Sequence, residues 1–376
     1  MNEERVVAFI DIGTNSARLL VASIDENGAY HLRTKTKERT RLGEGEYAAG
    51  RIQYRAIKRL MRILKQFMEI CRNLGASEVR AVATSAMRDA GNAQEIMDCI
   101  SAECDLTIRI ISGMEEARLI HRGVSTDINL GNDQALFIDI GGGSTELIVG
   151  DQYTYAILES MQLGAIRVTN QFLAPRYTRA VSQKWQVKMM THIMEVASPS
   201  ITRVSAYSFT RSIGSSGTVT NLAEVCTRLY HAEETRGLPD GSWKRQVLLL
   251  ADLEKLYPYM CSLTLKKRRK ILGLNRDRAE IILAGSAILL VVMRTLKILE
   301  IEINDRDLLY GMLMDYLAEM PGTPQFEQMP VKWEDILQLG RYWHLEEKHA
   351  RDISRMSLAL FDSAKECGLH NYGTWE

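Results

Sequence analysis

The stretch FIDIGGGSTELIVG, residues 137–150, places three consecutive glycines between two apolar runs, with Asp139 before them and Glu146 after them. An earlier stretch, FIDIGTNSARLLVA at residues 9–22, has nearly the same form, and eight of its fourteen positions are identical. The β-rich runs around each polar turn predict two β-hairpins. Asp139 and its counterpart Asp11 stand 128 residues apart, which is a domain-sized spacing rather than the short period of a solenoid. The sequence therefore predicts two related domains.

Each hairpin turn is a predicted phosphate-binding loop. A turn without bulky side chains exposes consecutive backbone N–H groups, and glycine lets an anion approach them closely. A lone run of three glycines is explained as well by a tight hairpin, but its near repetition a domain away favours two jaws that clamp a phosphate chain. The predicted phosphate-binding residues of the two turns are Gly13, Thr14, Asn15, Ser16, Gly141, Gly142, Gly143, Ser144 and Thr145.

The composition is typical of a globular protein with more than one domain. The chain has 376 residues, too many for one ordinary core, and its net charge is zero. No overall field attracts nucleic acid or an anionic membrane, and we expect neither as a partner. The longest apolar run, residues 281–293, is too short to span a bilayer and predicts a buried helix. The acidic start is no signal peptide and the cysteines lack metal-ligand spacing, so we expect a cytoplasmic protein.

The chain is predicted to divide at two points. The first domain covers residues 1–124 and the second covers 125–318, which a helix over 305–319 ends. Residues 320–330 hold three of the seven prolines and predict a linker. The remainder of 319–376 is amphipathic helix, a segment too small for a core of its own.

Four motifs make the chain similar to a known family. FIDIGTNSARLLVA, VATSAMRDA, IISGMEEARLIHRGV and FIDIGGGSTELIVG stand in the order and at the spacing of the exopolyphosphatase/guanosine pentaphosphate phosphatase family, over roughly residues 5–316. That family resembles actin, the sugar kinases and the heat-shock chaperone ATPases. The resemblance implies an α/β fold, with two ribonuclease-H-like (actin-like ATPase) domains of mixed sheet flanked by helices, a cleft between them and a short C-terminal helical extension. It also implies Mg²⁺-dependent hydrolysis of the terminal phosphate of inorganic polyphosphate or guanosine pentaphosphate.

Glu116 is the predicted general base. Phosphoryl transfer needs positioning, charge stabilisation and a group that orients and deprotonates the attacking water. In SGMEEARL, Ser112 fits a helix N-cap, and Glu115 stands at the capping-box position that bonds back to it. Glu116 lies about 100° further round the helix and has no such local role. The family's catalytic glutamate matches this same residue; the alternative is that both acids are ordinary residues of a helix N-terminus.

Two arginines are predicted to bind the phosphates. Arg18 directly follows the first hairpin, and Arg88 stands at the end of a strand, where a side chain can enter a cleft. Guanidinium groups bind phosphate in bidentate fashion. The alternative for Arg88 is a surface ion pair with Asp89.

Two acids are predicted to bind the metal. Asp139 and Glu146 flank the second turn and could hold Mg²⁺, or another divalent cation, beside the phosphate. The family reading favours both for the metal. Asp139 could equally be a hydrogen-bonded structural acid that holds its hairpin, and Asp11 fits that alternative more closely.

Other features keep more than one interpretation. The basic run KKRRK, residues 266–270, is a solvated helix face or a track for a long polyanion. The turn SSGTVTN, residues 215–221, is left unassigned, and His344 and His349 are expected at the surface. Residues 331–376 look like the first helices of an HD-type domain, which longer family members use for dimerisation and for part of a polyphosphate channel. The sequence therefore leaves open whether the protein forms a homodimer.

Three functions remain after these observations. The leading one is an exopolyphosphatase, and guanosine pentaphosphate 5′-phosphohydrolase is an alternative at the same site. A non-catalytic nucleotide or polyphosphate sensor is the alternative of another class. Glu116 and the two metal acids argue against a sensor, because a sensor has no need of a base.

Overall fold

The computed structural model describes most of the chain up to residue 320. The described residues are 4–26, 28–45, 50–131, 133–173, 178–235 and 247–320, with short helical stretches between 356 and 364. The predicted linker after residue 320, His344 and His349 lie outside them.

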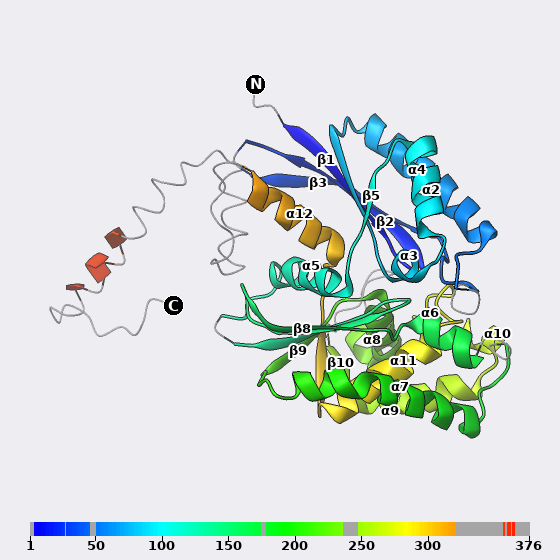
Figure 1. The fold of residues 1–376 in the computed structure, drawn as a ribbon. Coiled ribbons are helices and arrows are strands. Elements are labelled where there is room, and N and C mark those ends of the chain that lie inside the picture. The colour runs from blue at the N-terminus through cyan, green and yellow to red at the C-terminus, as the bar shows by residue number, and fades with distance from the viewer. Residues whose placement is uncertain are drawn as a thin grey trace.

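Two sheets repeat one topology (Figure 1). The first has the strand order β3 (Tyr30–Arg39), β2 (Ser16–Ile24), β1 (Arg5–Ile12), β4 (Glu78–Ala83) and β5 (Ile108–Ile110). The second has the matching order β8 (Tyr155–Met161), β7 (Thr145–Gly150), β6 (Ala135–Ile140), β9 (Arg211–Gly214) and β11 (Glu300–Ile303), with β10 (Val247–Leu249) added beside β11. In both, the hairpin strands pair antiparallel and the next strands pair parallel. The predicted duplication and α/β class are confirmed.

The outer face of each sheet is covered by amphipathic or wholly apolar helices. These are α2 (Tyr54–Asn73), α3 (Ser85–Asp89) and α4 (Ala93–Cys104) on the first sheet, and α7 (Gln183–Val204), α8 (Gly217–Tyr230), α9 (Leu250–Ser262) and α11 (Ile282–Thr295) on the second. Short helices complete the fold: α6 (Ala165–Val168), η1 (Thr169–Leu173), η2 (Ala232–Thr235) and α10 (Leu265–Arg268). Helix α11 is buried from Ile282 to Met293, as its apolar run predicts.

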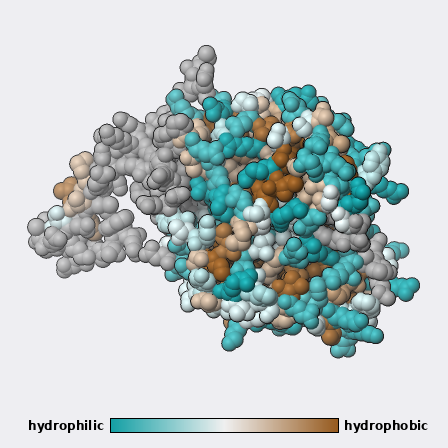
Figure 2. All heavy atoms as spheres, in the orientation of Figure 1, coloured by the Kyte–Doolittle hydropathy of each residue, from teal (hydrophilic) through white to brown (hydrophobic). Residues whose placement is uncertain are grey.

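The surface in Figure 2 is mainly hydrophilic, with separate smaller hydrophobic areas. In the described part of the chain, no helix is both long and apolar enough to cross a bilayer.

An inner layer of two helices, α5 (Gly113–Ser125) and α12 (Leu308–Glu319), lies between the sheets. Successive residues of a strand face opposite sides, so Phe9 of β1 packs into this layer while Ile10 packs on the outer helices. Phe137 of the second sheet joins the same inner cluster. Helix α12, which the sequence predicts as the end of the second domain, thus packs on α5 and β1 as well. The boundaries at 124/125 and 318/319 stay predictions.

The two inner helices cross at glycines. A Cβ on Gly311 would lie 2.0 Å from the Leu119 carbonyl oxygen, and one on Gly123 would lie 2.4 Å from the Asp307 carbonyl oxygen. A side chain at either position would therefore force the backbones apart.

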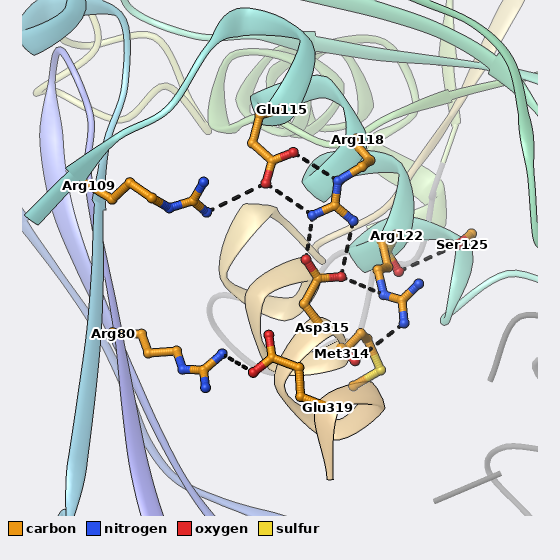
Figure 3. Close-up of polar contacts among 9 residues, drawn as sticks. All are labelled: Arg80, Arg109, Glu115, Arg118, Arg122, Ser125, Met314, Asp315 and Glu319. Carbon is orange, nitrogen blue, oxygen red and sulfur yellow. Dashed lines mark hydrogen bonds and ion pairs between the residues drawn. The ribbon is translucent and has the colours of Figure 1, made fainter. Parts of the chain in front are cut away.

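Ion pairs fasten the same crossing (Figure 3). Arg118 of α5 lies between Glu115 and Asp315, and Arg122 lies 2.8 Å from the same Asp315 carboxylate. Arg118 thus links Glu115, in the first turn of α5, to Asp315 of α12.

Candidate active site

A cleft lies between the sheets, and both predicted phosphate hairpins line it. The predicted residues in its lining are Gly13, Thr14, Asn15, Ser16, Arg18, Glu116, Asp139, Gly141, Gly142, Gly143 and Ser144. Asp11 also lines it. Sequence positions far apart are thus brought to one place.

Three predicted residues are not part of that lining. Arg88 contacts Glu116 of the lining, and Glu146 pairs in register with Asp139 of the lining. Thr145 is fully buried, and its hydroxyl donates to the Leu163 carbonyl at 2.5 Å. That hydroxyl is therefore already occupied, because the side chain points into the core of the second domain.

The two turns have the same backbone geometry. The N–H of the first residue donates to the carbonyl of the fourth at 3.0 Å in both, from Gly13 to Ser16 and from Gly141 to Ser144. In the described structure, the N–H groups between them have no hydrogen-bond acceptor, as at Gly142 and Gly143. Both turns therefore offer unengaged donors to the cleft.

The second turn is held from behind by the start of α6. The Gly142 carbonyl accepts from the N–H of Ile166 at 2.8 Å, and the Gly143 carbonyl accepts from Arg167 Nε at 2.8 Å. A Cβ on Gly164 would lie 2.3 Å from the Gly142 backbone, so this close support needs a glycine there. The carbonyls are engaged on this side, which leaves the N–H groups for a ligand.

Glu116 projects from the first turn of α5 and is 9% exposed. The helix begins as predicted, with Ser112 Oγ accepting from the N–H of Glu115 at 3.1 Å. The predicted bond from the Glu115 carboxylate back to the Ser112 cap is wrong, because this carboxylate pairs with Arg118 at 2.9 Å instead (Figure 3). Burial raises the pKa of Glu116 to about 8; Arg88 opposes that rise, and the charge of Asp11 adds to it.

Arg88 orients Glu116. Its Nη1 donates to the Glu116 carboxylate at 3.3 Å and to the Ile111 carbonyl at 2.8 Å. The alternative pair with Asp89 does not form, since Asp89 pairs with Arg167 of the second domain.

The remaining acids form a crowded, largely buried group. Ser215 Oγ donates to Asp139 at 2.9 Å, and Ser160 Oγ donates to Glu146 at 2.9 Å. Burial raises the pKa of both carboxyls, and the charges of Glu116 and Asp139 raise that of Glu146 further.

Asp11 belongs to this acidic group. Its Oδ1 is buried without a hydrogen-bond partner in the described structure, and burial raises the pKa of Asp11 to about 6. A buried carboxylate oxygen without a partner fits a cation more closely than a structural hydrogen bond.

The donor chemistry of the cleft fits Mg²⁺. Within the described ranges, no three His, Cys, Asp or Glu side chains converge as a complete metal-binding group. Mg²⁺ is commonly held by one or two carboxylates together with waters and substrate phosphates. Asp139 and Glu146 could provide the carboxylates.

Arg18 is held by an acid that the sequence reasoning missed. Its Nη1 lies 2.9 Å from the carboxylate of Asp307, and its Nε lies 3.9 Å from that of Asp11. Asp307 caps α12 by accepting from the N–H of Leu309 at 3.2 Å. An Asp before an apolar run is a local signal for such a cap, but nothing local signals the partner 289 residues away.

Arg278 is a second missed residue, and it lines the cleft. Its guanidinium lies against Gly217, the first residue of α8, where a Cβ would come within 2.0 Å of Nη2. In the described structure this side chain makes no ion pair or hydrogen bond. The positive end of a helix dipole disfavours a cation, so an anion between the two would stabilise both. The unassigned turn at 215–221 therefore borders the cleft.

The basic run 266–270 does not act as one surface. Arg268 is fully buried and donates to three backbone carbonyls, those of Met260, Leu263 and Ala279. Arg269 pairs with Glu280 at 2.6 Å, and only the lysines are exposed without such partners.

Known proteins are similar to this chain in sequence and in fold. The family model of the Ppx/GppA phosphatase family matches residues 20–320. Exopolyphosphatase 1 of Mycobacterium tuberculosis (strain ATCC 25618 / H37Rv) is 29% identical over 330 residues, which cover 86% of this chain and 92% of that protein.

Solved structures agree with this match. An exopolyphosphatase from Cytophaga hutchinsonii superposes with a TM-score of 0.76 at 27% identity, covering 85% of this chain and all of that one. A Ppx/GppA family member from Aquifex aeolicus shares the fold, with a TM-score of 0.67 at 24% identity. The duplicated hairpins, the cleft between them and the match over residues 20–320 lead to one conclusion: the chain belongs to the Ppx/GppA phosphatase family.

Proposed function

We propose that this protein is an exopolyphosphatase, which hydrolyses the terminal phosphate of inorganic polyphosphate with a glutamate-activated water. The observation that carries the proposal is the position of Glu116, a buried carboxylate that lines a cleft between two turns with unengaged N–H groups. The similar proteins from Mycobacterium tuberculosis and Cytophaga hutchinsonii are named exopolyphosphatases, which supports polyphosphate as the substrate.

The proposed chemistry divides between the two halves of the cleft. The N–H groups of both turns, Arg18 and Arg278 hold the terminal phosphates and offset their charge. The ionised Glu116 orients a water for in-line attack on the terminal phosphorus and takes its proton. The P–O bond to the rest of the chain breaks, orthophosphate leaves, and the shortened chain keeps the bridging oxygen. Arg88 favours the ionised form of Glu116 and limits its rotation.

Asp139 and Glu146 are the proposed ligands of a divalent cation, with Asp11 beside them. Mg²⁺ bound there would offset the negative charge on the phosphate oxygens. The support is the clustering of buried carboxyls whose pKa values are raised by burial and by one another.

A phosphate-release assay tests the function. Purified protein is given long-chain polyphosphate or guanosine pentaphosphate, each with Mg²⁺ or with EDTA. We expect Mg²⁺-dependent release from polyphosphate. Release from guanosine pentaphosphate alone would select the other phosphohydrolase at the same site. Binding of either compound without any turnover would favour a sensor.

A further inference from the structure

A row of side chains crosses the first sheet from the cleft to its edge. Asp11 of β1 pairs in register with Arg18 of β2, and Arg18 pairs with Lys37 of the edge strand β3. Residues opposite each other on neighbouring strands point to the same face. Strands lie about 4.8 Å apart, so the row extends about 10 Å away from the acid at the cleft.

The second sheet carries the corresponding row with different charges. There Asp139 pairs with Glu146, and Glu146 pairs with Ser160, whose hydroxyl donates to it at 2.9 Å. The duplication therefore extends to the third strand. In the second copy the outer residue, Ser160, donates a hydrogen bond to its neighbour Glu146. In the first copy the outer residue, Lys37, lies opposite another cation, Arg18.

That arrangement is unfavourable as it stands, because like charges directly opposite on a sheet repel. Other cations nearby are engaged: Lys35 lies 3.3 Å from Asp307, and Arg39 lies 2.5 Å from Asp277. In the described structure the side chains of Lys37 and Arg278 make no ion pair or hydrogen bond. The Lys37 side chain is exposed as a whole, yet desolvation of its ammonium group and the charges of Arg18 and Arg278 lower the pKa of Lys37 to about 7.

We infer that Lys37 forms a subsite for further phosphates of a condensed phosphate chain, next to the terminal phosphates at Arg18 and Arg278, and that the phosphate chain leaves the cleft over the edge strand β3. This rests on the proposed function, because the chain's terminal phosphate must first lie at Glu116. Arg18 is paired with Asp307, and a polyanion would supply the counter-charge that Lys37 and Arg278 lack in the described structure. The exposed lysines of 266–270 do not converge in this way.

Kinetics with two chain lengths test the subsite. The variants are Lys37→Gln, Lys37→Arg and the control Lys267→Gln, which removes one exposed charge elsewhere. For long-chain polyphosphate, Lys37→Gln should raise KM about tenfold, the loss of roughly one charged hydrogen bond. The rise should be clearly smaller for tripolyphosphate. Lys37→Arg should restore most of the affinity, and Lys267→Gln should behave as wild type with both substrates.

Three results would overturn the inference: no rise in KM for the long chain, an equal rise for tripolyphosphate, or a rise as large in Lys267→Gln. Calorimetric titration of wild type and Lys37→Gln with long-chain polyphosphate in EDTA separates this from the proposed function. Weaker binding by Lys37→Gln supports the subsite even if no substrate is hydrolysed. Equal binding by wild type and Lys37→Gln would rule out the subsite even if wild type is an active exopolyphosphatase.

Discussion

At the scale of the residue, Glu116 and Glu115 are adjacent but have different surroundings. Glu116 faces the cleft, whereas Glu115 is engaged by Arg118 on the other side of α5. Glu116→Gln should lower kcat by about 10²–10⁴-fold with KM little changed, the range for loss of a general base. Glu115→Gln is the matched control and should keep kcat near wild type. If both variants lose activity alike, the assignment of the base is wrong.

The pH dependence of the reaction tests the role of Arg88. A general base must be ionised, so kcat/KM should rise with pH through the pKa of Glu116. Arg88 lowers that pKa by charge and by hydrogen bonding. Arg88→Gln should therefore move the acidic limb of the kcat/KM profile to higher pH, by about one unit. A loss of activity without any move of the limb would limit Arg88 to phosphate binding.

At the scale of the element, the crossing of α5 and α12 depends on the absence of a side chain. Gly311→Ala would place a Cβ 2.0 Å from the Leu119 carbonyl oxygen. Although alanine favours a helix by about 1 kcal/mol over glycine, the clash should lower the free energy of unfolding by about 1–3 kcal/mol. Urea denaturation measures the change.

Glu319→Ala is the control for that experiment. It removes a partly exposed ion pair with Arg80 from the same helix (Figure 3), and such pairs contribute about 0–1 kcal/mol. A Gly311→Ala variant as stable as Glu319→Ala would show that the helices can move apart freely.

At the scale of the whole molecule, the buried acids make stability depend on pH and on the cation. The pKa values of Asp11, Asp139, Glu146 and Glu116 are all raised in the folded state. The folded state thus binds protons more tightly than the unfolded state, and stability should fall as the pH rises from about 4.5 toward 8. A cation bound only in the folded state offsets that loss.

Thermal unfolding in EDTA and in Mg²⁺ measures both effects. In EDTA, Tm should decrease between pH 5.5 and 8, and Mg²⁺ should raise Tm more at pH 8 than at pH 5.5. Glu146→Gln should reduce the difference between the Tm in Mg²⁺ and the Tm in EDTA. An equal Mg²⁺ effect at both pH values would mean that the cation does not bind at these carboxyls.

Features that repeat along the chain, or that depend on near neighbours, could be predicted from the amino-acid sequence alone. The two hairpins, the buried helix α11 and the Ser112 cap follow from residue periodicity and from contacts within a few residues. Local backbone geometry is set by local chemistry, so these predictions needed no knowledge of the fold. The position of Glu116 in the cleft was also predicted, with the family resemblance as its guide.

Which distant charged residues meet follows from the fold and could not be predicted from the sequence. Asp307 and Arg278 reach the cleft from the far end of the chain, and no local pattern distinguishes them from surface residues. Arg118 pairs with Glu115 three residues before it, but its second partner, Asp315, comes from α12 and lies 197 residues away in the chain. Charge interactions depend on separation in space, and the sequence records only separation along the chain.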